Sequence, residues 1–338
     1  MSESAASGLT NRWPQAAKYL RAGAIFLALI VLWIALSIGS QYFFTYRNIL
    51  NIFLQASPIA IIAAGFTVVL IAGEIDLSIG SAIGLTASVV ALLIIREEMP
   101  LGVAIALAMC VGLMIGLFNG YVTVYFGMPS FVVTLATLGI AQGTALVLTA
   151  GRPVSGFPSW YPFIGQGKVW GEIPMAIIIA VSVYAVLFFI LSRTSLGVQI
   201  YGVGGNREAA KLAGVRVNRV LIMAFAISGL CGGLAGIVLS SRLDAGHGNF
   251  GQSNLLDAVA AVVIGGTALM GGAGSVIGTL GGVLIIATIR NGLILMGVQT
   301  FWQQVAVGTI IIIAVAINQI AKGELPLVNT LVRLIRRR

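Results

Sequence analysis

Long apolar stretches separated by short polar segments dominate this chain. The main stretches without Asp, Glu, Lys or Arg cover residues 22–46, 48–73, 77–95, 99–151, 173–192, 220–241, 258–289 and 291–321. A helix needs about 20 apolar residues to cross the hydrocarbon core of a bilayer. The pattern therefore predicts a series of membrane-spanning helices.

Two of these stretches are long enough to hold more than one helix. The stretch 99–151 divides at residues 127–130, because Pro129 stops a helix and Ser130 is a suitable N-cap for the next. The stretch 258–289 divides at the glycine-rich run 265–274. We therefore predict an all-α, polytopic membrane protein with about ten transmembrane helices, near residues 22–40, 50–72, 78–95, 101–126, 131–149, 173–192, 219–240, 255–270, 275–290 and 302–320.

The distribution of basic residues predicts how the helices are oriented. With ten crossings, more than two thirds of the 19 lysines and arginines fall on the side of the termini, which by the positive-inside rule is the cytoplasm. We predict a cytoplasmic tail at 1–21, a transmembrane domain at 22–320 with a cytoplasmic loop at 193–218, and a basic cytoplasmic tail at 321–338.

Composition supports this class and argues against others. The chain is 59% hydrophobic and 9% charged, with a mean hydropathy of +1.04, whereas soluble domains contain roughly 25% charged residues. The net charge of +9 is spread over chain ends and loops, so it does not predict nucleic-acid binding. One histidine and two cysteines, Cys110 and Cys231, predict neither a metal site nor a disulfide framework.

The polar segment 73–81 places two carboxylates, Glu74 and Asp76, between two apolar helices. An ionisable group at membrane depth is costly and normally faces protein or water. One interpretation is a helix break that lines a solute pathway, with Glu74, Asp76 and Ser78 near the solute. The other is that Asp76 or Ser78 caps the next helix. The sequence leaves both open.

Four polar side chains inside predicted helices are further candidates for lining a pathway. They are Asn119, Thr134, Thr137 and Gln142. The alternative role for each is a hydrogen bond between neighbouring helices.

The loop 203–215 contains the pattern of a short helix. Asn206 is a suitable N-cap, Glu208 lies in the first turn, and Gly214 is a C-terminal stop. Three alanines, Ala209, Ala210 and Ala213, make one side of this helix small. Such a helix can connect two membrane helices or dock in a groove of another protein.

Four motifs together resemble one family of transport proteins. Glu208-Ala-Ala-x-x-x-Gly214 resembles the E-A-A-x-x-x-G loop of importer permeases of the ATP-binding cassette class. Together with it, Gly204-Gly-Asn206, Gly73-Glu-Ile-Asp-Leu-Ser-Ile-Gly80 and Gly265-Gly-Thr-Ala-Leu-Met-Gly-Gly272 resemble the ribose, xylose and arabinose permeases, with branched-chain amino acid permeases as more distant relatives. The resemblance spans roughly residues 25–320. The family's usual Gly-Gly-Ile-Asp is Gly73-Glu-Ile-Asp76 here, which adds a carboxylate.

This resemblance implies a permease subunit that passes a monosaccharide or related polyol from a periplasmic binding protein into the cytoplasm. It implies a bacterial inner-membrane protein that pairs with a second copy or a paralogue, in the ten-helix fold of vitamin B12-class importers. It also implies contact with a cytoplasmic ATP-binding cassette subunit through Asn206, Arg207, Glu208, Ala209, Ala210 and Gly214. The partner would bind ATP and Mg, because this chain lacks a Gly-x-x-x-x-Gly-Lys-Ser/Thr phosphate loop and is expected to be non-catalytic and free of cofactors.

Basic residues on the predicted outer side are candidates for docking the binding protein, because surface charge pairs steer association. They are Arg47, Arg152, Lys168 and Arg242. Ordinary solvated loop charges are the alternative.

Two other function classes compete with the importer interpretation. An ion-coupled secondary transporter of a small polar solute would need a buried carboxylate near the bilayer midplane, and Glu74, Asp76 and Asp257 all fall near predicted helix ends. A membrane scaffold without transport activity would not need interrupted helices. Within the importer class, the solute stays open among pentoses, hexoses and sugar alcohols.

Overall fold

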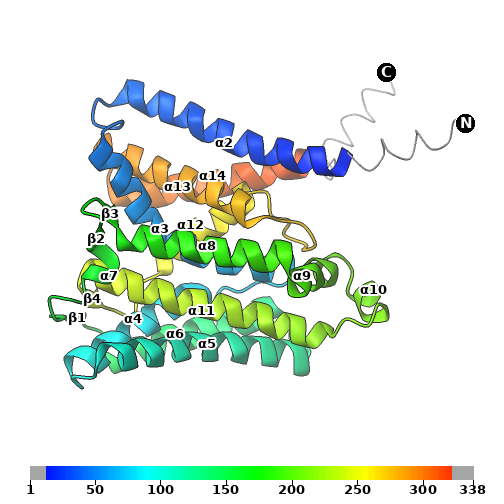
Figure 1. Cartoon of the computed structure of the whole chain (residues 1–338), viewed down its shortest axis with the longest axis horizontal. Coiled ribbons are helices and arrows are strands. Elements are labelled where there is room, and N and C mark those ends of the chain that lie inside the picture. Colours follow the sequence, from blue (N-terminus) through cyan, green and yellow to red (C-terminus); the bar gives the residue numbers. More distant parts are fainter. Residues whose placement is uncertain (1–12, 322–338) are drawn as a thin grey trace, which may run out of the picture.

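The computed structural model describes residues 13–321 and shows a bundle of helices aligned along one long axis (Figure 1). The helices are α2 (Trp13–Gly39), α3 (Tyr46–Ile71), α4 (Ile79–Ile95), α5 (Leu101–Tyr125), α6 (Ser130–Leu148), α7 (Phe163–Gln166), α8 (Met175–Arg193), α9 (Ser195–Gly205), α10 (Arg207–Leu212), α11 (Val217–Leu243), α12 (Gln252–Ile264), α13 (Val276–Leu295) and α14 (Thr300–Ala321). Four two-residue strands form two short antiparallel pairs, β1 (Val154–Ser155) with β4 (Ala245–Gly246) and β2 (Lys168–Val169) with β3 (Ile173–Pro174).

The two ends of the bundle differ in structure. One end, which we call the α10 end, carries α9, α10, the first turns of α2 and the last turns of α14 (Figure 1). The opposite end, which we call the strand end, carries α7, the four strands and the turn between α2 and α3. The first and last described helices therefore meet the same end of the bundle, as an even number of crossings requires.

The all-α, polytopic membrane architecture predicted from the sequence is confirmed. Within residues 13–321, six helices are long and apolar enough to cross a membrane: α3, α5, α6, α8, α11 and α13. Shorter apolar helical segments lie in α2, α4, α12 and α14. The total of ten crossings stays a prediction.

Several element boundaries differ from the sequence prediction. Helix α2 begins at Trp13 instead of residue 22, because a helix can extend past the apolar run that crosses the bilayer. Helix α9 was not predicted, since its 11 residues are mixed in polarity. At α6 the N-cap position is taken by Pro129. The Ser130 hydroxyl instead accepts a hydrogen bond from the Ile75 N–H. Of the two predicted tails, residues 1–12 and 322–338 lie outside the described residues.

Helix α3 forms the centre of the bundle. From Ala56 to its end every residue is buried, and α8, α11, α12 and α13 pack around it (Figure 1). A helix that is apolar on all sides is expected to be enclosed by other helices. The segment that follows α3 is therefore held deep in the protein, and this position determines where the candidate site lies.

Glycines allow α5 and α11 to pack with their backbones in contact. A Cβ atom on Gly229 of α11 would overlap the carbonyl oxygen of Gly112 on α5. A Cβ atom on Gly116 would overlap the carbonyl oxygen of Phe225. Glycines recur at every fourth position on both helices, at 112 and 116 and at 229 and 233, and small residues let membrane helices approach closely.

We predict that Gly116→Ala lowers the midpoint of thermal unfolding of the purified protein in detergent. The added methyl group meets the α11 backbone, which cannot rotate away, and overpacking of this kind typically costs about 1–3 kcal/mol. Gly102→Ala on the same helix is the matched control, because its Cβ atom would meet open space. Equal midpoints for the two variants would contradict the α5–α11 contact.

Candidate functional site

Three glycine-containing segments that are far apart in the sequence meet at the α10 end. They are residues 71–74 at the end of α3, residues 204–207 at the α9–α10 turn, and residues 271–272 in the loop between α12 and α13. The carbonyl oxygen of Ile71 accepts a hydrogen bond from the Gly272 N–H at 2.8 Å. A Cβ atom on Gly204 would overlap the same carbonyl oxygen, and one on Gly271 would lie 2.6 Å from the Gly73 Cα atom. We call this backbone contact the glycine junction.

The glycine junction unites motifs that the sequence presents as separate. Each of its segments belongs to one of the motifs that resemble sugar permeases, and no pattern in the sequence shows that they touch. Gly73 has a φ angle of 81° and Gly271 one of 84°, a conformation that side chains disfavour. Glycine is therefore required here both for conformation and for close approach.

Helix α10 has the start and stop predicted from the sequence. The Asn206 side chain accepts from the Ala209 N–H at 3.0 Å, as an N-cap does. At the other end Gly214 has a φ angle of 82°, and the Val215 N–H donates to the Ala210 carbonyl oxygen at 3.0 Å. This is a Schellman motif. The short helix is thus closed at both ends by local hydrogen bonds.

The exposed surface of α10 differs in one residue from the predicted contact surface. Glu208 and Ala209 are exposed, and Leu212 at the tip is 89% exposed. Ala210, which we expected to contact a partner, is buried and belongs to the main hydrophobic core. Ala210 therefore helps to anchor α10, and contact of this helix with a partner stays a prediction.

An ion pair connects α10 with the break between α3 and α4. Arg207 Nη2 donates to Glu74 Oε1 at 2.6 Å and to the Gly73 carbonyl oxygen at 3.2 Å. The Glu74 side chain is 8% exposed and that of Arg207 47%. The predicted coupling residue Arg207 and the predicted pathway residue Glu74 thus form one contact.

Asp76 lies at the centre of a buried chain of hydrogen bonds. Its Oδ1 atom accepts from the Ser78 N–H at 3.0 Å and from the Ser78 hydroxyl at 2.6 Å, and its Oδ2 atom accepts from the Ser228 hydroxyl at 2.7 Å. The chain continues from Asn119 Nδ2 to Ser78 Oγ and from Thr137 Oγ1 to Asn119 Oδ1, each at 2.7 Å. It ties the break to α4, α5, α6 and α11.

Most of the residues predicted to line a pathway take part in these hydrogen bonds. Asp76, Ser78, Asn119 and Thr137 are buried and bonded to one another, as the interhelical alternative requires. Asp76 also accepts from the N–H of Ser78, the residue just before α4, whereas the Ser78 side chain makes no capping hydrogen bond to that helix. Ser228 was missed, because one serine in an apolar helix has no distinguishing pattern. Whether any of these groups meets a solute stays a prediction.

The remaining two candidates lie at the edges of this network. Thr134 donates to the Ser130 carbonyl oxygen at 2.8 Å and contacts the Ile75 carbonyl oxygen at 3.2 Å. Gln142 is half-buried and donates to the Asn249 side chain at 3.1 Å. Thr134 therefore helps to hold the break in place, and Gln142 lies apart from it.

Asp257, a third carboxylate considered from the sequence, has a partner of its own. Arg290 of α13 donates to its Oδ1 atom from Nε at 3.1 Å and from Nη2 at 2.7 Å. This pair fastens α12 to α13 away from the glycine junction.

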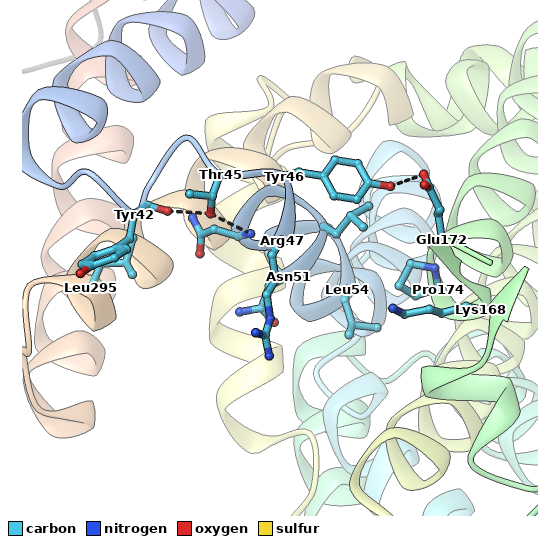
Figure 2. Close-up of a pocket in the computed structure, with 12 residues that line it drawn as sticks. Tyr42, Thr45, Tyr46, Arg47, Asn51, Leu54, Lys168, Glu172, Pro174 and Leu295 are labelled. Carbon is cyan, nitrogen blue, oxygen red and sulfur yellow. Dashed lines mark hydrogen bonds between the residues drawn. The ribbon is translucent and has the colours of Figure 1, made fainter. Parts of the chain in front are cut away.

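A pocket at the strand end contains two of the predicted docking residues. The cavity measures about 700 Å³ and is lined by Arg47 and Lys168, with Tyr46 donating to Glu172 Oε2 at 2.6 Å (Figure 2). Arg152 is also exposed. The fourth, Arg242, is half-buried.

Arg242 has a role inside the protein. It donates from Nη1 to the Leu54 carbonyl oxygen at 3.2 Å. Its guanidinium therefore holds α11 to α3 instead of pointing freely outward.

We predict that Ser228→Ala lowers the midpoint of thermal unfolding, because it removes a hydroxyl from which the buried Asp76 Oδ2 accepts. Leaving a buried acceptor without its donor costs about 1–3 kcal/mol. Ser182→Ala on α8 is the control, since that hydroxyl is exposed and bonds only within its own helix. A midpoint for Ser228→Ala as high as that of the control would show that Asp76 does not depend on this bond.

Comparisons with known proteins identify the family to which the chain belongs. The chain matches a family described as branched-chain amino acid transport system / permease component over residues 48–315. It is 39% identical over 305 residues to the ribose import permease protein of Haemophilus influenzae, covering 89% of this chain and 94% of that protein. It is 41% identical over 296 residues to the ribose import permease protein of Bacillus subtilis, covering 87% and 91%.

A third relative, the D-allose transport system permease protein of Escherichia coli, is 37% identical over 299 residues, covering 88% of this chain and 91% of that protein. No solved structure matches the chain. The family match extends over more than half of the sequence, and each of the three relatives is covered almost completely. This chain belongs to the family of branched-chain amino acid transport system permease components.

Proposed function

We propose that this chain is the transmembrane permease subunit of an ATP-binding cassette importer for a monosaccharide or a related polyol. Its relatives are named as permeases for ribose, allose and xylose, and they are covered over nearly their whole length. The observation that carries the proposal is the projecting helix α10, joined directly to a break between two membrane helices. A simple scaffold has no use for such a connection.

The ATPase partner docks on α10 from the cytoplasm. Glu208, Ala209 and Leu212 are the exposed side chains of this helix that such a partner would meet. ATP and Mg are bound by the partner, because this chain has no phosphate loop. Closure of the partner on ATP then displaces α10, and the displacement reaches the α3–α4 break through the glycine junction. Neither bond formation nor bond cleavage takes place in this subunit.

The sidedness of the protein follows from this docking. The α10 end faces the cytoplasm of a bacterial cell with an inner membrane, and both termini lie on that side. The strand end faces outward and receives the periplasmic binding protein. Arg47, Arg152 and Lys168 are exposed there and steer its approach through acidic groups on the partner.

A second copy or a paralogue completes the transporter, and the sugar passes between the two permeases. A sugar binds through hydrogen bonds and by stacking on aromatic rings. Tight binding inside the membrane would slow release, so a pathway with few polar groups suits import. Gln142 on α6 is our candidate for contact with the solute, because its amide is outside the buried network and bonds to the exposed Asn249 side chain.

We predict that Glu208→Lys abolishes ATP-dependent uptake of radiolabelled ribose in proteoliposomes containing the ATPase partner and the binding protein. Charge reversal on the exposed side of α10 removes a contact with the partner and places a cation near the N-terminus of a helix, where it is unfavourable. Glu97→Lys is the control, since Glu97 is an exposed carboxylate at the strand end.

Uptake by Glu208→Lys equal to that of the control would show that the ATPase does not act through α10. Uptake by the unmodified protein that persists without ATP or the ATPase would instead indicate an ion-coupled transporter. Competition by unlabelled pentoses, hexoses and sugar alcohols in the same assay identifies the solute.

A further inference from the structure

The ion pair between Arg207 and Glu74 is placed to transmit movement. Arg207 is the first residue of α10, so its backbone moves with that helix. Of the two salt bridges found within the described residues, only this one involves α10. A cation at the first position of a helix is unfavourable for the helix dipole, so stability of α10 does not explain why an arginine is found here.

The burial of the two partners differs in a way that favours joint movement. Glu74 is 8% exposed, whereas Arg207 is 47% exposed and its backbone belongs to α10. If the guanidinium moved away alone, the Glu74 carboxylate would be left with little water and no cation. A buried charge that loses its partner is strongly disfavoured. Displacement of Arg207 is therefore expected to carry Glu74 with it.

Glu74 is followed at once by residues that hold three other helices. The Ile75 N–H donates to the Ser130 hydroxyl at 3.1 Å, and the Ile75 carbonyl oxygen contacts Thr134 Oγ1 at 3.2 Å, which ties the break to the start of α6. Asp76 then binds α4 and α11. A shift at Glu74 thus reaches α4, α6 and α11 within two residues.

The space around the ion pair permits such a shift. A cavity of about 340 Å³ lies beside it and is lined by Glu74, Arg207, Ser130 and Asn218. Close-packed interiors resist movement, but a pair on the wall of a cavity has room to change position. The Arg207–Glu74 pair therefore has room to move, and it does more than hold its two segments in place.

We infer that Arg207 and Glu74 are positioning residues for transport, and that their ion pair transmits the displacement of α10 to the break between α3 and α4. This inference rests on the proposed function. It assigns a role to the carboxylate at position 74, where the sugar permeases that this chain resembles usually have a glycine. The backbone contacts of the glycine junction hold the segments together, and the ion pair links the side chains that change position.

The test compares charge neutralisation with charge exchange in the reconstituted complex. We expect Glu74→Gln and Arg207→Gln each to reduce sugar transported per ATP hydrolysed by about tenfold, a common size for coupling between two sites. We expect the double variant to be no worse than either single variant, because both lose the same contact. Exchange of the charges, Glu74→Arg with Arg207→Glu, should restore at least half of the ratio.

Asp257→Asn is the control for a general loss of stability, because it removes a carboxylate from the other ion pair far from α10. It should lower the thermal midpoint and leave the ratio of sugar to ATP unchanged in the folded complex. The inference is wrong if the single variants keep the normal ratio, or if the charge exchange performs no better than they do. Failure of the unmodified complex to show ATP-dependent uptake would instead contradict the proposed function.

Discussion

The approach of three backbone segments without side chains between them is the constraint on which the rest of this structure depends. At the glycine junction the Ile71 carbonyl oxygen accepts from Gly272 and touches Gly204. A contact between backbones cannot relax by rotating a side chain. The end of α3, the α9–α10 turn and the loop before α13 are therefore held as one unit. A displacement of α10 is expected to displace the end of α3, which lies at the centre of the bundle.

Burial of charge explains why this unit is connected to so many helices. Glu74 and Asp257 each pair with an arginine, and Asp76 accepts from two serines. In a membrane protein a carboxylate without such partners is expensive. The partners come from α10, α13, α4 and α11, so satisfying these three groups also fixes the relative positions of the helices. The Arg207–Glu74 pair and the bonds of Asp76 belong to the break that carries movement, whereas the Asp257–Arg290 pair only holds α12 to α13.

Much of the fold could be predicted from the sequence, because lipid imposes simple rules on helix length and composition. The apolar runs located α3 through α6, α8, α11 and α13, and the pattern from Asn206 to Gly214 predicted both ends of α10. The α9 helix was not predicted, because a short helix of mixed polarity has no periodic signal. Asp76 was recognised as important, yet its bond to Ser228 was not, since a sequence does not show which faces of two helices meet.

The meeting of the three glycine motifs and the Arg207–Glu74 pair were beyond prediction for the same reason. Both join segments that are far apart along the chain, and the hydrogen bond from Arg207 to Glu74 spans 133 positions. The resemblance to sugar permeases identified which segments matter but not how they touch. Polar residues in membrane helices can bond to other helices or meet a solute, and only the structure shows that Asn119 and Thr137 bond to each other.

The amount of sugar transported per ATP hydrolysed by Gly204→Ala, compared with Gly202→Ala, tests the central claim most directly. Both glycines lie in α9, but a methyl group at 204 would meet the Ile71 carbonyl oxygen, whereas one at 202 meets open space. The account predicts that the Gly204→Ala complex assembles and hydrolyses ATP with little transport, and that Gly202→Ala transports normally. Normal transport by Gly204→Ala would show that movement does not pass through the glycine junction.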